Sequence, residues 1–180
     1  MELFGFLKRG RLPTANWQRD WEHAVEALDV TASARLGAEL AERRRRGEDV
    51  ELEEEMLQAL DDVLVLEREL EQGVWPALET SHRVAAGEPC HFSAAVSMPD
   101  DPAQPTGRLL LTSGRAAFAG GARTPALPWH AARDVLRGGR DLLFLRTAED
   151  GMRFRCNTFS DALCGAAIAR RLMRRARRPI

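Results

Sequence analysis

The chain has 180 residues, 44% of them hydrophobic and 29% charged, which is enough for one large or two small domains with a substantial core. No apolar run approaches the roughly 20 residues that cross a bilayer, and the N-terminus lacks the pattern of a secretory signal, so we expect a cytoplasmic protein. Three irregularly spaced cysteines do not form a disulfide framework, in agreement with a reducing compartment.

Charge is distributed unevenly along the chain. Residues 1–86 carry 19 acidic and 11 basic side chains, a net charge of −8. Residues 87–180 carry 8 acidic and 15 basic side chains, a net charge of +7. Opposite charges of this size favour docking of the two halves on each other, or a separate partner for each half.

Two amphipathic helices are predicted near the N-terminus. The first covers about 16–28, where apolar residues recur at spacings of four, four and three. The second starts at Thr31 or Ser33 and ends in the arginines 43–46, directly before Gly47. Cations in the last turn complement the helix dipole, and glycine accepts the left-handed conformation that commonly follows a helix.

A third helix, about 50–72, has the most regular pattern in the chain. Acidic residues crowd its start, where the helix dipole favours anions, and Gly73 follows its end. Its apolar residues alternate in steps of four and three, like a heptad seam: Leu52, Met56, Ala59, Val63, Leu66 and Leu70. We expect the seam to form the core of an intramolecular bundle. A dimer interface through Leu52, Met56, Val63, Leu66 and Leu70 is the alternative.

The second half predicts short antiparallel strands. A further short helix at 77–86 and a joint at 87–89 would separate a helical domain, 1–86, from a β domain, 88–180. Seven segments are short, apolar and punctuated by glycine or proline: 90–98, 107–113, 115–120, 124–131, 133–137, 141–147 and 152–158. A helical pattern at 160–178 closes the chain. The expected fold class is α+β, an N-terminal helical bundle followed by an antiparallel seven-stranded barrel or bent sheet with a C-terminal capping helix.

The β half resembles a known superfold. The segment Gly107-Arg108-Leu109-Leu110-Leu111-Thr112-Ser113-Gly114-Arg115-Ala116-Ala117-Phe118, followed by Leu127-Pro128-Trp129, resembles PH-like domains of the GRAM and bacterial PH-like types. The resemblance covers about residues 88–178 and implies a domain that binds a protein, a peptide or a small ligand. Lipid-binding members carry basic residues between their first two strands. Here that loop carries Asp100 and Asp101, with a cation only at its end, Arg108, and an acidic loop repels phosphate.

Residues with reactive side chains do not form a recognisable motif. Cys90, His91, Cys156 and Cys164 lack the spacing of zinc ligands, and we expect cysteines that pack in the core. The triplet Thr80-Ser81-His82 lacks the surroundings of an activated nucleophile. We therefore expect no enzyme, no metal and no cofactor; catalysis by His82 or Cys90 is the less favoured alternative.

Two cationic segments are candidates for an anionic surface. Phe4 and Phe6, which precede several basic residues, form either an interfacial anchor or an apolar segment docked on the bundle, and docking is favoured. The C-terminal arginines are candidates for anionic lipid or for the acidic half of the chain: Arg170, Arg171, Arg174, Arg175, Arg177 and Arg178. Nucleic-acid binding is not expected, because no aromatic residue accompanies them.

The sequence thus favours a non-enzymatic binding or adaptor protein whose helical half contacts a partner protein or a second copy. The alternative is a peripheral membrane protein that binds anionic lipid through the N-terminal apolar segment and the C-terminal arginines.

Overall fold

The computed structural model describes residues 14–80, 82, 85, 87–120 and 124–177. Proximity of Cα atoms divides the chain into two compact units, Met1–Asp61 and Asp62–Ile180. The division falls inside the helix α3 (Glu51–Glu71), so this helix contributes to both units. The domain boundary expected near residue 87 stays a prediction.

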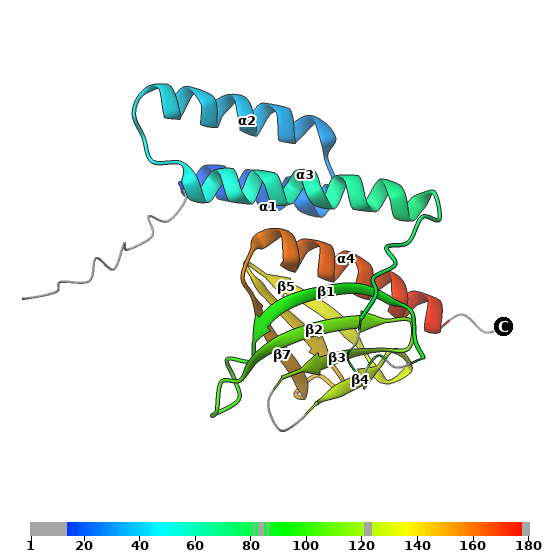
Figure 1. The fold of residues 1–180 in the computed structure, drawn as a ribbon. Helices are drawn as coiled ribbons and strands as arrows, with labels where there is room; N and C mark the ends of the chain where they lie inside the picture. Colours follow the sequence, from blue (N-terminus) through cyan, green and yellow to red (C-terminus); the bar gives the residue numbers. More distant parts are fainter. Residues whose placement is uncertain (1–13, 81, 83–84, 86, 121–123, 178–180) are drawn as a thin grey trace, which may run out of the picture. The chain divides into compact units, whose positions relative to one another are not determined.

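The first unit is helical. It contains α1 (Ala15–Ala27), α2 (Val30–Arg45) and the first half of α3, drawn from blue to cyan in Figure 1. Trp17 and Trp21 of α1 are both 1% exposed. The indole Nε1 of Trp21 donates a hydrogen bond of 2.6 Å to the carbonyl oxygen of Met56 in α3. The spacing of four residues therefore correctly predicts that Trp17 and Trp21 are buried, but Leu28, the last residue of the predicted apolar face, is 37% exposed because it is the left-handed C-cap of α1.

The start of α2 differs from the expectation. The helix begins at Val30 rather than at Thr31 or Ser33, because Asp29 acts as its N-cap. The Asp29 carboxylate accepts hydrogen bonds from the hydroxyl of Thr31 at 2.7 Å, from the Thr31 backbone N–H at 2.8 Å and from that of Ala32 at 3.2 Å. These hydrogen bonds, led by that of the Thr31 hydroxyl, lower the pKa of Asp29.

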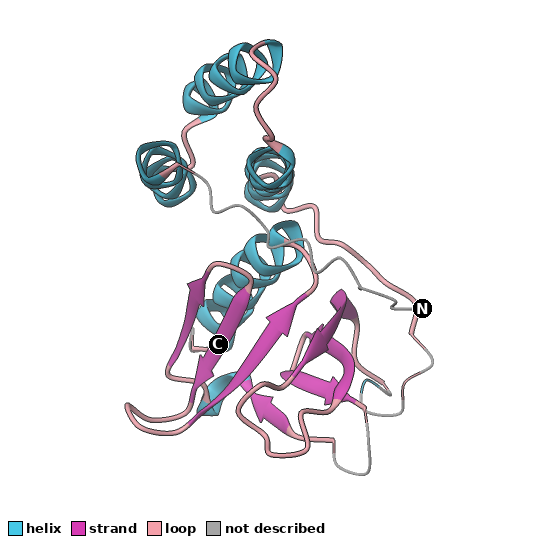
Figure 2. Ribbon diagram, turned by 90° about the vertical axis from the view of Figure 1, so that its left-hand side faces the viewer, coloured by secondary structure: helices cyan, strands magenta, loops and turns pink. Residues whose placement is uncertain are grey.

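The second unit is built on one seven-stranded antiparallel sheet. Its strands are β1 (Cys90–Ser97), β2 (Thr106–Thr112), β3 (Arg115–Ala119), β4 (Ala126–Pro128), β5 (Asp134–Gly138), β6 (Asp141–Leu145) and β7 (Gly151–Cys156). Their order is β4-β3-β2-β1-β7-β6-β5. β1 pairs with β2 along its length, but only Val96 and Ser97 pair with β7. The sheet is open and curved, with β4 and β5 at its edges (Figures 1 and 2). The expected α+β class is confirmed.

The strand expected at 124–131 is shorter in the structure. β4 ends at Pro128, and the short 3₁₀ helix η2 (Trp129–Ala131) follows it. Proline has no backbone N–H to continue a strand ladder, which explains the early end. The Trp129 side chain turns into the core, where its Nε1 donates to the carbonyl oxygen of Thr112 at 2.8 Å. Its ring lies 6.3 Å from that of Phe144, centroid to centroid.

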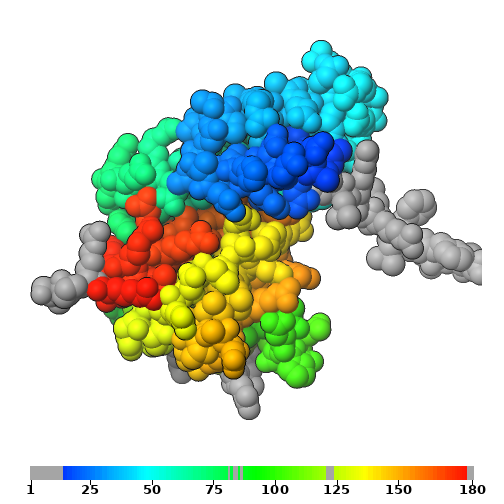
Figure 3. Space-filling model, turned by 180° about the vertical axis from the view of Figure 1, so that it is seen from behind, coloured from blue at the N-terminus to red at the C-terminus, as the bar shows by residue number. Residues whose placement is uncertain are grey.

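The C-terminal helix α4 (Phe159–Ala176) lies on this sheet. Its N-cap is Thr158, whose hydroxyl oxygen accepts a hydrogen bond from the backbone N–H of Asp161 at 3.0 Å. The helix packs against β1, β2, β5, β6 and β7, and Figure 3 shows it in red beside the yellow residues of β5. A Cβ atom on Gly165 would lie 3.0 Å from a methyl of Leu142 and 3.1 Å from the ring of Phe92. Glycine at this position therefore allows the helix to approach the sheet closely.

The helix expected at 77–86 is not found among the described residues of that range. Instead, Leu78 forms an antiparallel bridge with Cys90, in which the Leu78 N–H donates to the Cys90 carbonyl oxygen at 2.8 Å. Ala85, whose backbone is 3₁₀-helical, is buried together with Cys90 and Leu110. Leu78 and Ala85 therefore both contact the sheet, one through its backbone and the other through its side chain.

Candidate functional site

Two of the C-terminal arginines bind the edge of the sheet. Arg170 Nε donates to the carbonyl oxygen of Val135 in β5 at 3.0 Å. Arg177 Nη2 donates to the carbonyl oxygens of Ala132 and Arg133, both at 2.7 Å. These guanidinium groups occupy backbone acceptors at and just before the β5 edge, where a further strand would otherwise pair.

Other arginines of this tail also have partners within the second unit. Arg171 Nε donates to the Glu67 carboxylate at 2.9 Å, and the Arg175 guanidinium lies 5.0 Å from the centre of the Trp75 ring. Arg174 is exposed and has no polar partner in the described part of the chain. Arg178 lies outside the described residues. None of the helices in the described ranges is both long and apolar enough to cross a membrane.

The acidic loop between β1 and β2 is bound to the neighbouring strand. Asp100 forms an ion pair with Arg153 Nη1 at 3.2 Å. Arg153 and Arg155 of β7 both bind Asp141, with a distance of 2.8 Å from Arg155 Nε to Asp141 Oδ1. The hydrogen bond from Arg155, followed by that from Arg153, lowers the pKa of Asp141. Arg153 and Arg155, the basic side chains of β7 in this cluster, are therefore already neutralised, whereas Arg108 has no ion pair among the described residues.

The three cysteines are free thiols, and burial is the largest influence on the pKa of each. Burial raises the pKa of Cys90, that of Cys156 to about 12 and that of Cys164 to about 11. Thiols with such pKa values carry almost no thiolate at neutral pH, and thiolate is the nucleophilic form. Cys156 and Cys164 are therefore protonated at neutral pH.

His91 and His82 form hydrogen bonds with nearby residues of the same unit. His91 is nearly buried; its Nδ1 lies 2.7 Å from the carbonyl oxygen of Pro76, and its Nε2 lies 2.9 Å from the hydroxyl of Ser113. The His82 backbone N–H donates to the Thr80 hydroxyl at 3.2 Å, while Ser81 of the same triplet lies outside the described residues. Across the described ranges, no three His, Cys, Asp or Glu side chains are grouped so as to hold a metal ion.

The apolar residues proposed for an oligomer interface or a membrane anchor are either largely buried or outside the described residues. Met56, Val63, Leu66 and Leu70 of the heptad seam are between 2% and 8% exposed. Leu52 is half-buried. Phe4 and Phe6, the candidate anchor, lie outside the described residues. The buried seam positions have the exposure of core residues, whereas the anchor stays a prediction.

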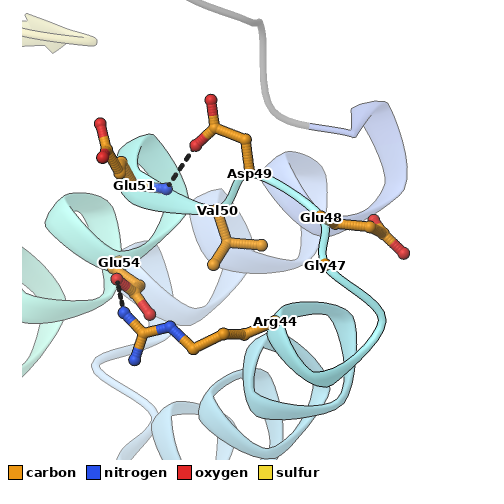
Figure 4. A pocket seen from close by; sticks show the side chains of 7 residues that line it. All are labelled: Arg44, Gly47, Glu48, Asp49, Val50, Glu51 and Glu54. Atoms are coloured by element: carbon orange, nitrogen blue, oxygen red, sulfur yellow. Dashed lines mark hydrogen bonds and ion pairs between the residues drawn. The ribbon is translucent and has the colours of Figure 1, made fainter.

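One hollow of the first unit lies where α2 ends and α3 begins (Figure 4). Its volume is about 350 Å³, and its lining is Arg44, Gly47, Glu48, Asp49, Val50, Glu51 and Glu54. Arg44 Nη2 binds the Glu54 carboxylate at 2.7 Å, and Asp49 accepts a hydrogen bond from the Glu51 N–H at 3.2 Å. Acidic groups are favourable at the start of a helix, so this cluster serves the stability of α3.

A second hollow lies beside β1 and β2 of the second unit, and we call it the β1–β2 hollow. Its volume is about 410 Å³, and its lining is Leu78, Glu79, Thr80, His82, Ser93 and Arg108. Arg108 donates from Nε to the Ser93 hydroxyl oxygen at 2.9 Å and from Nη2 to the Ser93 carbonyl oxygen at 3.4 Å. A cation held by two neutral acceptors, in a hollow that also contains the hydroxyl of Thr80, is suited to bind an anionic ligand.

The sequence analysis did not identify the β1–β2 hollow as a site. Arg108 stands out only as the single cation near an acidic loop, and Ser93 has no signal of its own. The two residues meet because of the register between β1 and β2, in which Ser93 lies opposite Leu110 and Ala95 lies opposite Arg108. Period-two alternation places Ser93 and Ala95 on one face, but it does not specify this register.

Comparison with known proteins yields no identification: no protein-family model matches the chain, and no curated protein matches it.

Proposed function

We propose that this protein is a non-enzymatic binding or adaptor protein whose second unit is a PH-like domain of the GRAM or bacterial PH-like type. The observation that carries the proposal is the strand order β4-β3-β2-β1-β7-β6-β5 together with the helix α4 that packs on the same sheet. This arrangement supports the resemblance carried by residues 107–118 and 127–129. Since one fold hosts many functions, the resemblance supports a class of activity, and the ligand must be argued from a site.

The chemistry of the described side chains supports binding rather than catalysis. The thiols have raised pKa values, and both ring nitrogens of His91 contact polar groups of the protein itself. Nucleophilic catalysis needs an activated nucleophile beside a base, and general acid–base catalysis needs a group free to exchange protons with a substrate. The partner we propose is a protein, a peptide or a small ligand in the cytoplasm.

The membrane alternative receives less support from the described contacts. Lipid binding through the C-terminal tail needs arginines whose guanidinium groups are free to meet phosphate. Arg170, Arg171, Arg175 and Arg177 each contact a carbonyl, a carboxylate or an aromatic ring of the protein. We therefore propose the binding role ahead of the membrane role.

The test is a binding screen of the full chain. An isotope-labelled sample is titrated with a library of short peptides and small acids, and backbone amide shifts are followed by NMR. We expect saturable shifts in residues of the second unit with at least one probe, and no conversion of any probe. Turnover that disappears in Cys90→Ala or His82→Ala would overturn the proposal. So would sedimentation with anionic vesicles that weakens with salt and is lost when residues 1–9 are removed.

A further inference from the structure

One side of the β1–β2 hollow is formed by a segment that is hydrogen-bonded to the sheet. Leu78, at one side, is attached to Cys90 through the bridge described above. Thr80 and His82 follow in the same segment, and the His82 N–H bonds to the Thr80 hydroxyl. On the other side, Ser93 belongs to β1 and Arg108 to β2. The polar side chains of the hollow therefore belong to two hydrogen-bonded strands and to a segment that is bonded to β1. Because this backbone is already ordered, ligand binding costs less conformational entropy.

Arg108 is the group in the hollow most suited to recognise a ligand. Its bonds to Ser93 use Nε and one N–H of Nη2, which leaves Nη1 without a hydrogen-bond partner among the described residues. No described carboxylate forms an ion pair with it, in contrast to Arg115, which binds Glu88. A guanidinium presents its N–H groups in a planar fork that matches the two oxygens of a carboxylate.

The surrounding groups indicate how many charges the ligand carries. Glu79 is the other charged residue of the lining, so the formal charges of the hollow cancel. Glu79 repels a singly charged carboxylate less strongly than a doubly charged phosphate, so the carboxylate is tolerated better. Thr80 accepts the His82 N–H and Ser93 accepts the Arg108 Nε–H, so the hydrogen of each hydroxyl is available for an oxyanion.

The hollow also has an apolar side. Leu78 is 43% exposed, so part of its apolar side chain is in contact with water in the hollow. An apolar group of a ligand that covered this side chain would remove water from both surfaces. At about 410 Å³, the hollow is within the usual range of pockets for small ligands.

We infer that the β1–β2 hollow binds the carboxylate of a ligand that carries an apolar substituent next to it, with Arg108 as the carboxylate-binding residue and Leu78 as the apolar contact. Both a small carboxylic acid and the C-terminus of a peptide that ends in an apolar residue have this chemistry. The inference names a site and a ligand class for the binding role proposed above and rests on that proposal.

The test uses matched probes on the labelled full chain. N-acetyl-leucine and a pentapeptide that ends in leucine with a free carboxylate are titrated separately, to distinguish the two sources. N-acetyl-leucinamide, which lacks the charge, and inorganic phosphate serve as control probes. We expect at least one carboxylate probe to give saturable shifts at the amides of Leu78, Thr80, Ser93 and Arg108. We expect the amide and phosphate probes to bind at least tenfold more weakly.

Substitutions of Arg108 test whether its positive charge binds the carboxylate. Arg108→Gln keeps a polar side chain but removes the cation, and we expect it to weaken the carboxylate probe at least tenfold. Arg108→Lys keeps the positive charge but lacks the planar guanidinium, and we expect its affinity for the carboxylate probe to lie between those of the parent protein and Arg108→Gln. Arg174→Gln removes an exposed arginine elsewhere in the second unit and should leave binding unchanged. Backbone amide spectra that match the parent away from the hollow establish that each variant is folded.

The outcomes separate this inference from the proposed function. The inference is overturned if the amide binds as well as the acid, if phosphate binds best, if Arg108→Gln and Arg174→Gln behave alike, or if the carboxylate probes produce no saturable shift. In each of those cases, a peptide from the screen that shifts other residues of the second unit leaves the binding role standing. Turnover of a probe would remove the binding role itself.

Discussion

Single side chains connect the segment before β1 to the sheet. The Glu88 carboxylate accepts hydrogen bonds from the Thr112 hydroxyl, from the Gly114 N–H at 3.2 Å and from Arg115 Nε at 2.9 Å. A Cβ atom on Gly114 would lie 2.7 Å from a Glu88 oxygen, so the turn between β2 and β3 is shaped around this carboxylate. Glu88 is 21% exposed, which leaves its interactions only partly screened by water.

Glu88 predicts a dependence of stability on pH. The hydrogen bond from Arg115, followed by that from Thr112, lowers the pKa of Glu88. A lowered pKa in the folded state means that the stabilisation is fully present above the unfolded value of about 4.3 and is lost as the pH falls through the folded pKa. We expect Glu88→Gln to reduce the free energy of unfolding by about 1–2 kcal/mol at pH 7, and by progressively less below pH 4.

Urea unfolding at several pH values measures this difference. Glu149→Gln, which neutralises an exposed carboxylate in the β6–β7 loop, is the matched control and should have little effect. A penalty for Glu88→Gln that stays constant down to the acid limit, or that equals the control, would contradict the assigned role.

The thiols predict a simple reactivity pattern. With burial raising the pKa of Cys156 to about 12 and that of Cys164 to about 11, neither presents a thiolate to a reagent at pH 8. We expect the folded protein to show no fast-reacting thiol toward a disulfide reagent, and three thiols in guanidinium chloride. Rapid labelling of Cys90, Cys156 or Cys164 in the folded protein would revive a catalytic role.

At the scale of elements, the two edges of the sheet are protected by different means. β4 is short and ends in Pro128, and prolines are common at sheet edges because they cannot donate to a ladder. β5 is longer, and there the arginines of α4 supply the donors. The same contacts hold α4 to the strand at the edge, so one set of side chains both stabilises the helix and blocks further strand pairing.

The edge contacts predict the behaviour of a paired variant. Replacing Arg170 and Arg177 by Gln exposes the carbonyl oxygens of Val135, Ala132 and Arg133. We expect the free energy of unfolding to fall by about 1 kcal/mol for each lost arginine, and association to increase with protein concentration. Arg174→Gln removes one arginine of α4 without exposing a carbonyl oxygen and serves as the control. Light scattering that shows equal association for both variants would contradict the protective role of the edge contacts.

For the whole molecule, the central question is whether the heptad seam joins helices of one chain or of two. Met56 is 2% exposed and Val63 is 4% exposed within the single chain, so little of the seam remains for a second copy. We therefore expect a monomer of about 20.1 kDa. The charge asymmetry, −8 against +7 for residues 1–86 and 87–180, acts within this monomer or toward a partner.

Size-exclusion chromatography with light scattering, at low and high salt, measures both properties. We expect one species with the mass of a single chain under both conditions. A stable dimer at low protein concentration would favour the intermolecular seam instead. Association that appears only at low salt would show that the oppositely charged halves meet between molecules, because salt screens such contacts.

Periodicity and turn residues were sufficient to predict most of the elements. The three N-terminal helices, the seven strands and the C-terminal helix all follow from local patterns of apolar residues, glycine and proline, and each is present within a few residues of its expected limits. The exceptions are local as well. Asp29 caps α2, which therefore begins earlier than expected. Leu78 pairs with β1 because the carbonyl oxygen of Cys90 lies beside its N–H, a proximity that local sequence patterns do not predict.

The sequence by itself determined the fold class, the buried faces and the separation of acidic from basic residues, because these depend on spacing and composition along the chain. Only the tertiary structure decided the partners of the C-terminal arginines and the position of Arg108 beside Ser93 and Leu78. The guanidinium groups bind acceptors that are separated from them by tens of residues in the sequence. The register of two strands determines which polar side chains become neighbours. The candidate ligand site therefore became visible only when the strands were paired.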